Sequence, residues 1–466
     1  MKILLVNPQI PHNFYNDEFH LPSGVLAIGS VLKEAGENVK LLDLKVSQHK
    51  NPDVLTDVLD SEFAKTAHDY KPDLIGFGGL FSGNFLDVLR MSKLSKKNSP
   101  DTPIIMGGTH PTMYAKEILE NCPSLDYLTL GEAESTVAGF IKILRQGKRD
   151  FSGLEGFAYR KKGLPTINER TKNFYIKDLD SLPFPAYELI NFEDYDVDTS
   201  TWHNPKNLKI RTEIPISTSR SCPYDCNFCA SSEIMGRGFR KRSANNVLDE
   251  IEYLYHEHQQ THFGIMDDNF TFDKQRLLDI CNGINKRSLD IQFETHNGVS
   301  IKTLDDEIIE AMANAGLTRV ALPIESGSDY IRNQIMRKEL KREKIYEVVN
   351  TLKKYDSIFL RAFYVIGMPE ETKETLQDTY NMIKELELDK VHLTNIIPFP
   401  RTKVYEQAKK DNLLRNVNPD ELYLSDKMYQ ANFNTYFIKP YNMEIEELHE
   451  FRQKCEDMIK SKHTKP

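Results

Sequence analysis

Residues 221–229 read SCPYDCNFC and hold three of the chain's six cysteines, Cys222, Cys226 and Cys229, at the spacing C-x3-C-x2-C. Proline and asparagine between the cysteines favour a loop over a helix. Thiolates are the usual ligands of iron–sulfur clusters, and a cubane has four irons. Three cysteines therefore leave one iron open to a small molecule. The spacing predicts a [4Fe–4S] cluster that is held by one loop and binds a ligand.

Two other uses of these cysteines are less specific. Structural zinc sites usually have four ligands as paired C-x2-C units, and the sequence has no second pair, although His203 could be recruited. A disulfide needs an oxidising compartment, and no signal peptide is evident at the N-terminus. The other cysteines, Cys122, Cys281 and Cys455, have no ligand spacing and are interpreted as ordinary thiols.

The bulk properties exclude several classes of protein. A chain of 466 residues is too long for one ordinary core, so two or three domains are expected. The net charge of −9 argues against a nucleic-acid binder that works through a basic surface. No apolar run approaches the ~20 residues of a membrane span. We expect a cytoplasmic protein in a reducing cell that works without oxygen, because exposed clusters are oxygen-sensitive.

Residues 1–145 show five alternating strand-like and helix-like segments. The expected strands are Ile3–Val6, Val39–Leu42, Leu74–Phe77, Ile104–Met106 and Tyr127–Leu130. Such alternation predicts an α/β domain, a doubly wound, flavodoxin- or Rossmann-like parallel sheet covered on both faces. Ligands of these sheets bind at the carboxyl ends of the strands, where glycine lets the backbone approach them. This domain alone could bind FMN, act as a receiver module or bind nothing.

Residues 146–210 are rich in charge, glycine and proline, which predicts an ordered linker. Residues 211–400 contain six further strand candidates separated by helical runs. These strands are Ile214–Thr218, Phe263–Met266, Ile291–Thr295, Val320–Ile324, Ile358–Tyr364 and Val391–Ile396. Six β/α repeats predict a partial (β/α)6 barrel of the TIM type, with its site at the carboxyl ends of the strands. Residues 401–466 are expected to form a small, mostly helical C-terminal region.

The cysteine spacing resembles that of the radical S-adenosylmethionine (SAM) superfamily, C-x3-C-x-aromatic-C, with Phe228 in the aromatic position. The segments that follow the predicted barrel strands resemble further elements of this family. They are Met266-Asp267-Asp268-Asn269, Glu294-Thr295-His296-Asn297, Ile324-Glu325-Ser326-Gly327-Ser328, Gly367-Met368-Pro369-Glu370-Glu371-Thr372 and Pro398-Phe399-Pro400-Arg401-Thr402. The sequence departs from the family at two glycines, which Glu370 and Arg401 replace.

The resemblance implies that SAM chelates the open iron and is cleaved to a 5′-deoxyadenosyl radical. It also implies that the backbone near Phe228 contacts adenine. The side chains implied to line the SAM pocket are Asp267, Asp268, Glu294, Glu325 and Ser326. Arg337 could pair with the SAM carboxylate, because a guanidinium suits that geometry; a solvated helix cation is the equal alternative.

Residues 1–145 resemble the cobalamin-binding domain that precedes the barrel in B12-dependent radical SAM enzymes. The similar stretches are the opening K-I-L-L-V-N-P, Leu21-Pro22-Ser23-Gly24, Gly107-Gly108-Thr109-His110-Pro111-Thr112 and Gly131-Glu132-Ala133-Glu134. The loop residues implied to surround cobalamin are Gly78, Gly79, Gly107, Gly108, His110, Gly131 and Glu132. No D-x-H-x-x-G sequence occurs, so cobalamin would be held without a histidine ligand. His110 is interpreted as a loop residue near the corrin edge.

The resemblance predicts a cobalamin-dependent radical SAM enzyme, a C-methyltransferase that acts on an unactivated carbon through a 5′-deoxyadenosyl radical and methylcobalamin. A cyclase or rearrangement enzyme with the same cofactors is the first alternative, and a non-catalytic SAM- or redox-responsive binding protein is the second. Methylthio transfer is disfavoured, because those enzymes carry extra cluster cysteines in the N-terminal domain. The expected partners are a small-molecule or peptide substrate and an electron donor such as flavodoxin or ferredoxin.

Overall fold

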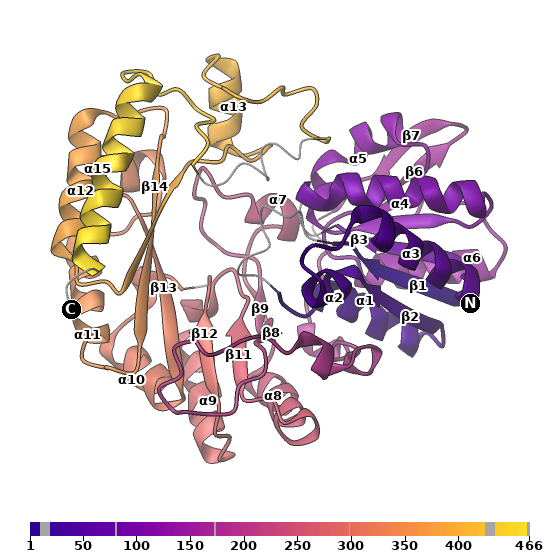
Figure 1. Cartoon of the computed structure of the whole chain (residues 1–466), viewed down its shortest axis with the longest axis horizontal. Coiled ribbons are helices and arrows are strands. Elements are labelled where there is room, and N and C mark those ends of the chain that lie inside the picture. The colour runs from indigo at the N-terminus through magenta and orange to yellow at the C-terminus, as the bar shows by residue number, and fades with distance from the viewer. Residues whose placement is uncertain (10–18, 80–81, 172–173, 298, 425–433, 464–466) are drawn as a thin grey trace. The chain divides into compact units, whose positions relative to one another are not determined.

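The computed structural model describes residues 1–9, 19–79, 82–171, 174–297, 299–424 and 434–463. The chain forms two compact units. Unit 1 comprises residues 1–197 with 234–236 and 418–432, and unit 2 comprises residues 198–233, 237–417 and 433–466. Figure 1 shows both units.

Unit 1 is built on a seven-stranded sheet with the order β2-β1-β3-β4-β5-β6-β7. The first five strands are parallel, as predicted. They are β1 (Lys2–Asn7), β2 (Asn38–Asp43), β3 (Leu74–Gly78), β4 (Ile104–Gly107) and β5 (Tyr127–Thr129). The chain runs from β1 to the edge strand β2 and then crosses back over β1 to β3. Right-handed crossovers therefore place α1 (Ser23–Glu34) on one face of the sheet, and α3 (Thr56–Tyr70) and α4 (Phe85–Asn98) on the other.

The sheet of unit 1 is apolar on both faces because helices cover both. The inner residues of β1, from Ile3 to Val6, are all buried. Such continuous apolar runs are typical of parallel strands in this position. Helix α6 (Glu134–Arg145) packs beside α1, and its Phe140 and Ile141 join Ile3 in one core cluster. The doubly wound fold predicted from the sequence is confirmed.

The predicted linker is more structured than its composition suggests. Residues 157–168 form β6 (Phe157–Lys161) and β7 (Leu164–Asn168), which extend the sheet of unit 1 with antiparallel pairing. Phe157 is fully buried in the core of that unit. Two short strands with charged residues between them carry too little periodicity to stand out in a segment rich in glycine and charge.

Unit 2 holds a six-stranded, all-parallel sheet with the order β15-β14-β13-β12-β11-β8. The strands are β8 (Ile214–Ile216), β11 (His262–Ile265), β12 (Gln292–Thr295), β13 (Leu317–Glu325), β14 (Phe359–Ile366) and β15 (Lys390–Asn395). Each new strand is added at the same edge, so the sheet curves in one direction. Figure 1 shows the helices on its outer side. This is the predicted partial (β/α)6 barrel.

Four crossover helices of the barrel begin at side-chain caps. Ser243 caps α8 (Ala244–His258), Asp273 caps α9 (Lys274–Lys286) and Asp305 caps α10 (Asp306–Asn314). Thr372 opens α12 (Lys373–Glu385) with a capping box. Each cap satisfies a backbone N–H that the helix itself cannot pair, so the sequence determines where each helix starts and thus how long each preceding loop is.

The amino ends of the barrel strands are covered by residues 202–206. The Trp202 ring lies 5.3 Å from the His262 ring, and His203 Nε2 lies 2.8 Å from the Ser357 carbonyl oxygen. Gln292 Nε2 donates to Asn204 Oδ1 at 2.6 Å. This segment therefore forms a floor beneath the sheet, and the carboxyl ends of the strands remain as the site-bearing edge.

The C-terminal region contains α13 (Lys403–Lys410) and α15 (Ile445–His463). Helix α15 packs along α12 and β15 on the outside of the barrel. Among the described residues, no helix has the length and apolarity that a membrane crossing requires.

Candidate functional site

The cysteine loop follows β8 and is held in place by residues other than the cysteines. Phe228 packs on an apolar cluster that includes Met336, Ile396 and Val404. The Asn227 N–H donates to the Met336 carbonyl oxygen at 3.3 Å, and the Asn227 carbonyl accepts from Val404 N–H at 3.2 Å. The aromatic residue of the motif is thus the anchor of the loop, which explains its place in the spacing.

The three cysteines of the loop are free thiols. The Ser231 N–H points at Cys229 Sγ at 3.5 Å, and Asn269 Nδ2 lies 3.6 Å from Cys222 Sγ. Burial raises the pKa of all three thiols, that of Cys229 to about 11. A bound metal would instead hold them as thiolates. Three neighbouring thiols with N–H donors aimed at sulfur fit an iron–sulfur cluster.

A buried lysine next to this loop was missed by the sequence analysis. Lys338 Nζ lies 2.9 Å from Glu325 Oε1, and both side chains are largely buried. Burial by itself would lower the pKa of Lys338, but the charges of Glu325 and Cys226 outweigh it and raise that pKa. The permanent positive charge beside the cysteines is therefore Lys338. A basic pair, Arg337-Lys338, was visible in the sequence, but burial decides which member faces inward.

Arg337 points elsewhere. It adopts φ +59° and its Nη1 lies 3.5 Å from Asp225 Oδ2, with more than half of its side chain exposed. Asp225 also pairs with Arg237 at 3.1 Å and with Lys403. The hydrogen bond from Lys403 is the main reason that the pKa of Asp225 is lowered. The predicted contact between Arg337 and the SAM carboxylate remains a prediction, and the structure gives Arg337 another partner.

The turn after β13 is preorganised by strain and packing. Glu325 has φ +67°, which is a left-handed conformation that costs energy for a residue with a side chain. A Cβ on Gly327 would lie 2.4 Å from the Asp378 carbonyl oxygen, so only glycine fits against α12. Fully buried Arg332 donates to the Ser326 carbonyl at 2.7 Å and to the Leu340 carbonyl at 2.9 Å. Arg332 is a second residue that sequence analysis missed.

The two aspartates after β11 have different roles. Asp267 is buried and accepts hydrogen bonds from Thr218 N–H, Thr218 Oγ1 and Ser219 Oγ at 2.5–2.6 Å. It ties the start of the cysteine loop to β11. Asp268 is exposed and accepts from Ser231 Oγ at 2.7 Å. Of this predicted pair, Asp268 therefore keeps a carboxylate that a ligand can reach.

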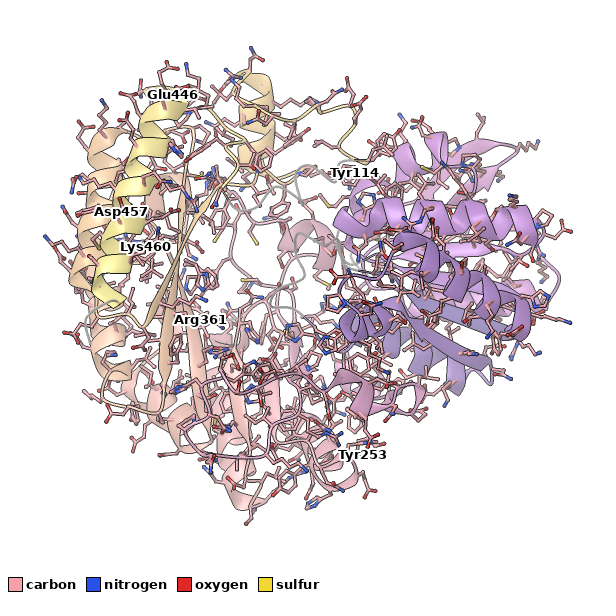
Figure 2. All side chains as sticks on the ribbon, viewed as in Figure 1. Tyr114, Tyr253, Arg361, Glu446, Asp457 and Lys460 are labelled. Atoms are coloured by element: carbon pink, nitrogen blue, oxygen red, sulfur yellow. The ribbon has the colours of Figure 1, made fainter. Side chains whose placement is uncertain are left out.

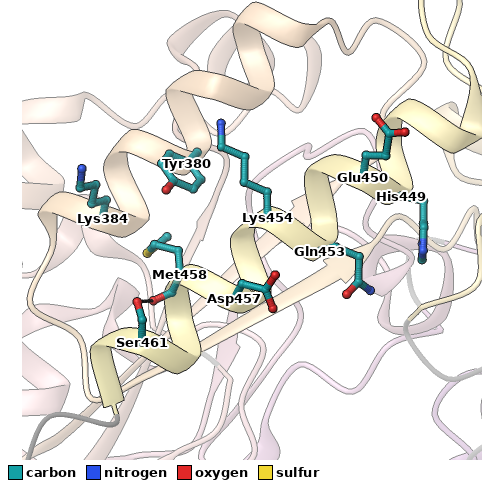
Figure 3. A pocket seen from close by; sticks show the side chains of 9 residues that line it. All are labelled: Tyr380, Lys384, His449, Glu450, Gln453, Lys454, Asp457, Met458 and Ser461. Atoms are coloured by element: carbon teal, nitrogen blue, oxygen red, sulfur yellow. Dashed lines mark hydrogen bonds between the residues drawn. The ribbon is translucent and has the colours of Figure 1, made fainter.

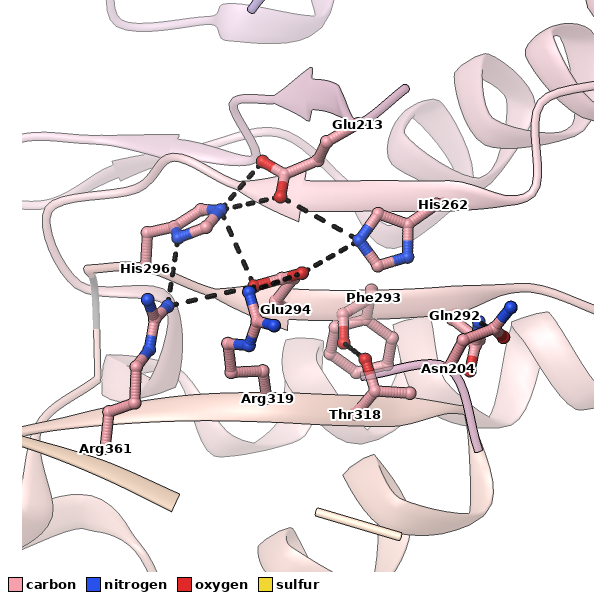
Figure 4. Close-up of polar contacts among 10 residues, drawn as sticks. All are labelled: Asn204, Glu213, His262, Gln292, Phe293, Glu294, His296, Thr318, Arg319 and Arg361. Atoms are coloured by element: carbon pink, nitrogen blue, oxygen red, sulfur yellow. Dashed lines mark hydrogen bonds and ion pairs between the residues drawn. The ribbon is translucent and has the colours of Figure 1, made fainter. Parts of the chain in front are cut away.

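Glu294 belongs to a group of charged side chains that we call the lumen network. Its members are Glu213, His262, Glu294, His296, Arg319 and Arg361 (Figure 4). They come from five neighbouring strands or the residues beside them and contact one another, which is possible only on the concave face of the sheet.

Glu294 accepts from His262 Nε2 at 2.8 Å and from Arg319 Nη1 at 3.0 Å. Burial alone would raise its pKa, but these contacts outweigh burial and lower it. The carboxylate is therefore charged and is held by protein groups inside the barrel. A contact between Glu294 and SAM remains a prediction.

The segments after β14 and β15 contain Glu370 and Arg401, the two residues that replace glycines of the family. The buried Glu371 carboxylate accepts from the N–H groups of Gly367 at 2.7 Å and Met368 at 3.2 Å, and burial raises its pKa to about 7. Glu370 accepts from Gln407 Nε2 at 2.6 Å. In the segment after β15, Arg401 adopts φ +66°, so it keeps the glycine-like conformation despite its side chain. Of the two departures, only that at Arg401 carries backbone strain.

In unit 1 the predicted glycines lie at the carboxyl ends of the parallel strands. The sheet order reverses between β1 and β3, which is where ligands of such sheets bind. Gly78 ends β3 at this point and Gly79 follows it; Gly107 ends the neighbouring β4 and Gly108 follows it. A Cβ on Gly79 would lie 2.3 Å from Met106 Cε, and one on Gly107 would lie 2.5 Å from Thr129 Oγ1. A side chain at either position would therefore have to displace the side chain of Met106 or Thr129.

Gly131 and Glu132 hold parts of unit 1 together. Gly131 has φ +72°, and a Cβ there would lie 3.1 Å from the Ile234 carbonyl oxygen. The Glu132 carboxylate accepts from Ile176 N–H at 3.0 Å. His110 lies in the first turn of α5 (Thr109–Asn121), fully buried, with its ring 4.2 Å from the Phe85 ring and 4.9 Å from the Tyr114 ring. Burial lowers the pKa of His110 to about 3, so this ring is neutral.

A separate groove of about 810 Å³ lies between α12 and α15 (Figure 3). Its wall is charged, and Lys454 Nζ sits 4.5 Å above the Tyr380 ring. None of its lining residues belongs to a strand end or to the cysteine loop. Figure 2 shows the same contrast: Arg361 lies on the inner side of the curved sheet, whereas Glu446, Asp457 and Lys460 lie on α15 at the outside.

Two family models match the sequence. Residues 216–383 match the Radical SAM superfamily, and residues 17–141 match the B12 binding domain. The chain is therefore a radical SAM protein with a B12-binding domain. This confirms the family inferred from the cysteine spacing and the strand-end motifs.

Characterised and uncharacterised relatives share most of the chain. An uncharacterized methyltransferase of Pyrococcus horikoshii is 28% identical over 85% of this chain and 80% of its own length. Cytidylyl-2-hydroxyethylphosphonate methyltransferase of Streptomyces wedmorensis is 26% identical over 82% of this chain and 77% of its own. The anaerobic magnesium-protoporphyrin IX monomethyl ester cyclase of Cereibacter sphaeroides is 24% identical over 94% of this chain and 67% of its own.

Solved structures share the fold. The radical SAM methyltransferase TsrM of Kitasatospora setae, with cobalamin and a [4Fe–4S] cluster bound, superposes with a TM-score of 0.70 at 16% identity and covers 89% of this chain and 79% of its own. The cobalamin-dependent radical enzyme OxsB, with aqua-cobalamin and SAM bound, gives a TM-score of 0.67 at 19% identity and covers 98% of this chain and 61% of its own.

Proposed function

We propose that this protein is a cobalamin-dependent radical SAM enzyme that methylates an unactivated carbon of a small-molecule or peptide substrate. The observation that carries the proposal is the cysteine loop. It presents three free thiols at the carboxyl end of a partial barrel, in a chain that also has a B12-binding domain. Methyltransferases among the relatives support methyl transfer as the reaction.

Cys222, Cys226 and Cys229 would hold a [4Fe–4S] cluster, which supplies the electron that cleaves SAM when both are bound. The residues around the loop suit that ligand. Lys338 offers a buried positive charge for a carboxylate, and Asp268 keeps a reachable carboxylate for an amino group. The strained turn at Glu325 is fixed before any ligand arrives, so little ordering is needed on binding.

Cobalamin would be held at the carboxyl ends of the strands of unit 1, where it would supply a carrier for the methyl group. Gly108, which follows β4 with φ +116°, has no side chain that would obstruct a large planar ligand. His110 is neutral and packed between Phe85 and Tyr114. This packing supports the prediction that the corrinoid has no histidine ligand from this loop.

Cyclisation is the second candidate, because the magnesium-protoporphyrin cyclase of Cereibacter sphaeroides aligns over 94% of this chain. The two reactions differ in product mass, since methylation adds a methylene unit and cyclisation does not. Both reactions need an electron donor. Three cations surround the single exposed carboxylate of Asp225 on the cysteine loop, which suits an acidic carrier such as flavodoxin or ferredoxin in the cytoplasm.

The test is the metal and corrinoid content of protein reconstituted anaerobically with iron, sulfide and hydroxocobalamin. We expect about four irons and one cobalamin per chain, and release of 5′-deoxyadenosine once SAM and a reductant are added. Four irons without cobalamin would remove methylation and keep radical chemistry. A loaded cluster that releases no 5′-deoxyadenosine would identify a SAM- or redox-responsive binding protein instead.

A further inference from the structure

Two arginines of the lumen network are held in fixed positions by one carboxylate. Arg319 Nη1 lies 3.0 Å from Glu294 Oε2, and Arg361 Nη2 lies 3.7 Å from the same oxygen (Figure 4). Glu294 is itself only 2% exposed. Because each guanidinium group is positively charged, an anion placed between the two would be attracted by both.

The network favours an anion over a metal ion. Ligand atoms of Glu213, Glu294 and His296 lie within 4.8 Å of one another, which is a spacing that a cation could use. However, Arg361 Nη2 lies 3.1 Å from His296 Nδ1 and donates to it. A metal on His296 Nε2 would require Nδ1 to carry a proton and face an acceptor. Arg319 also donates a hydrogen bond to the Glu294 carboxylate. A cation would therefore have to displace Arg361 from His296 and Arg319 from Glu294.

Both guanidinium groups keep donors that the protein does not use. Across the described parts of the chain, no acceptor lies within hydrogen-bond distance of Arg319 Nη2 or Arg361 Nη1. The Nε atoms of both are buried without a partner as well. The two side chains are 20% and 14% exposed, so their terminal nitrogens are reached from the lumen.

The second carboxylate of the network, Glu213, contacts His296. The carboxylates of Glu213 and Glu294 balance the two arginines. Burial by itself would lower the pKa of His296, but its hydrogen bond to Glu213, at 2.7 Å, and the charge of that carboxylate outweigh burial and raise it. Gly264 leaves the space for this arrangement, because a Cβ there would lie 1.9 Å from Glu213 Oε1.

The carboxyl ends of the barrel strands, with the loops that follow them, form the rim of the barrel. The network lies between this rim and the floor segment, residues 202–206. His262, on the side of the network that faces the floor segment, packs against the Trp202 ring. Glu294 is paired in register with Gly264, and Asp267 at the rim is three residues further along, which corresponds to about 10 Å. A ligand anchored at the network can therefore extend to the rim, where the cysteine loop begins.

We propose that Arg319 and Arg361 bind the anionic group of the substrate, a carboxylate or a phosphoryl group. This inference rests on the proposed function, because it takes the barrel lumen as the substrate chamber. Arg319 Nη2 and Arg361 Nη1 donate charge-assisted hydrogen bonds to the acid. The substrate is then an organic acid long enough to extend from the network to the rim, about 10 Å along the strand direction.

The experiment is anaerobic calorimetric titration of the full-length, cluster-loaded protein with inorganic phosphate and, separately, with acetate. We expect one site per chain, and the tighter of the two ligands identifies the class of acid. Arg319→Gln and Arg361→Gln should each weaken binding by about tenfold or more, since each removes charged donors. Arg319→Lys serves if Arg319→Gln does not fold; it keeps the charge and should still weaken binding because the planar fork is lost.

Arg287→Gln is the matched control, since Arg287 is likewise paired with carboxylates, Asp249 at 2.7 Å and Glu252 at 2.6 Å, but on the outer helices. It should bind phosphate and acetate as the unmodified protein does. The inference would be overturned if Arg361→Gln and Arg319→Lys bound phosphate and acetate as tightly as the unmodified protein does. It would also be overturned if the unmodified protein bound neither ligand. Release of 5′-deoxyadenosine by the unmodified protein is measured in parallel. Its failure would reject the proposed function while leaving the anion-binding result to be judged by itself.

Discussion

The rim and the lumen of the barrel both hold buried carboxylates, but different groups satisfy them. At the rim, Asp267 and Glu371 accept from backbone N–H groups and hydroxyls within a few residues of the strand ends they brace. In the lumen, Glu213 and Glu294 are paired with histidine and arginine side chains from other strands. The rim carboxylates therefore fix the shape of loops, whereas the lumen carboxylates hold strands together and position cations.

The largest effect should come from the cysteine loop at the rim. Cys226→Ala removes one of three ligands, so the reconstituted protein should lose its cluster and all release of 5′-deoxyadenosine. Iron content and visible absorption measure the loss. Cys281→Ala is the control, because Cys281 is a buried thiol of α9 outside the loop. Retention of the full cluster by Cys226→Ala would contradict the assignment.

The next effect should come from the lumen. Glu294→Gln leaves Arg319, Arg361 and His262 without their shared counter-charge, and breaking a buried pair from one side costs about 3 kcal/mol or more. Urea unfolding of the barrel unit measures the loss. The double variant with Arg319→Gln should recover part of it, because the uncompensated charge is then gone. Strictly additive losses would show that the two side chains do not interact.

The stability of the barrel should depend on pH because of one rim carboxyl group, that of Glu371. The pKa of Glu371 is about 7 in the folded protein and near its ordinary value when unfolded. The folded state therefore binds the proton more tightly, so this group stabilises below about pH 4.5 and that contribution is lost as the pH rises to about 7. The loss is about 3 kcal/mol. Glu371→Gln should flatten this part of the stability profile, as measured by urea unfolding at several pH values.

Glu134→Gln provides the comparison for that profile, since Glu134 is a buried carboxyl of α6 in unit 1. Its substitution should leave the slope of the barrel's profile unchanged. An unchanged slope in Glu371→Gln as well would show that another group is responsible.

The smallest effect concerns backbone strain at the rim. Arg401 adopts φ +66°, where glycine has no steric penalty. Arg401→Gly should stabilise the barrel by about 1 kcal/mol or less, because relief of the left-handed strain exceeds the entropy that glycine adds to the unfolded chain. Thermal unfolding measures the shift. Glu370→Gly, at the other replaced glycine, should destabilise instead, since it removes the bond to Gln407.

Local residue patterns were enough to predict the features of this protein that depend on neighbouring residues. Strand and helix order, the parallel sheet, the partial barrel and the cysteine loop all follow from local periodicity, caps and spacing, which act over a few residues. The predicted rim residues fell at strand ends for the same reason. The two strands at residues 157–168 were not predicted because their periodicity is short and because β6 pairs with β5, which lies well before it in the sequence.

Which polar residues contact one another depends on the packing of distant segments. Lys338 rather than Arg337 faces the cysteines, because burial and the pairing with Glu325 select one member of an adjacent pair. The lumen network joins residues from 213 to 361, and only the curvature of the sheet brings their charges within reach of one another. Such contacts depend on packing between strands far apart in the chain, and no local pattern encodes them.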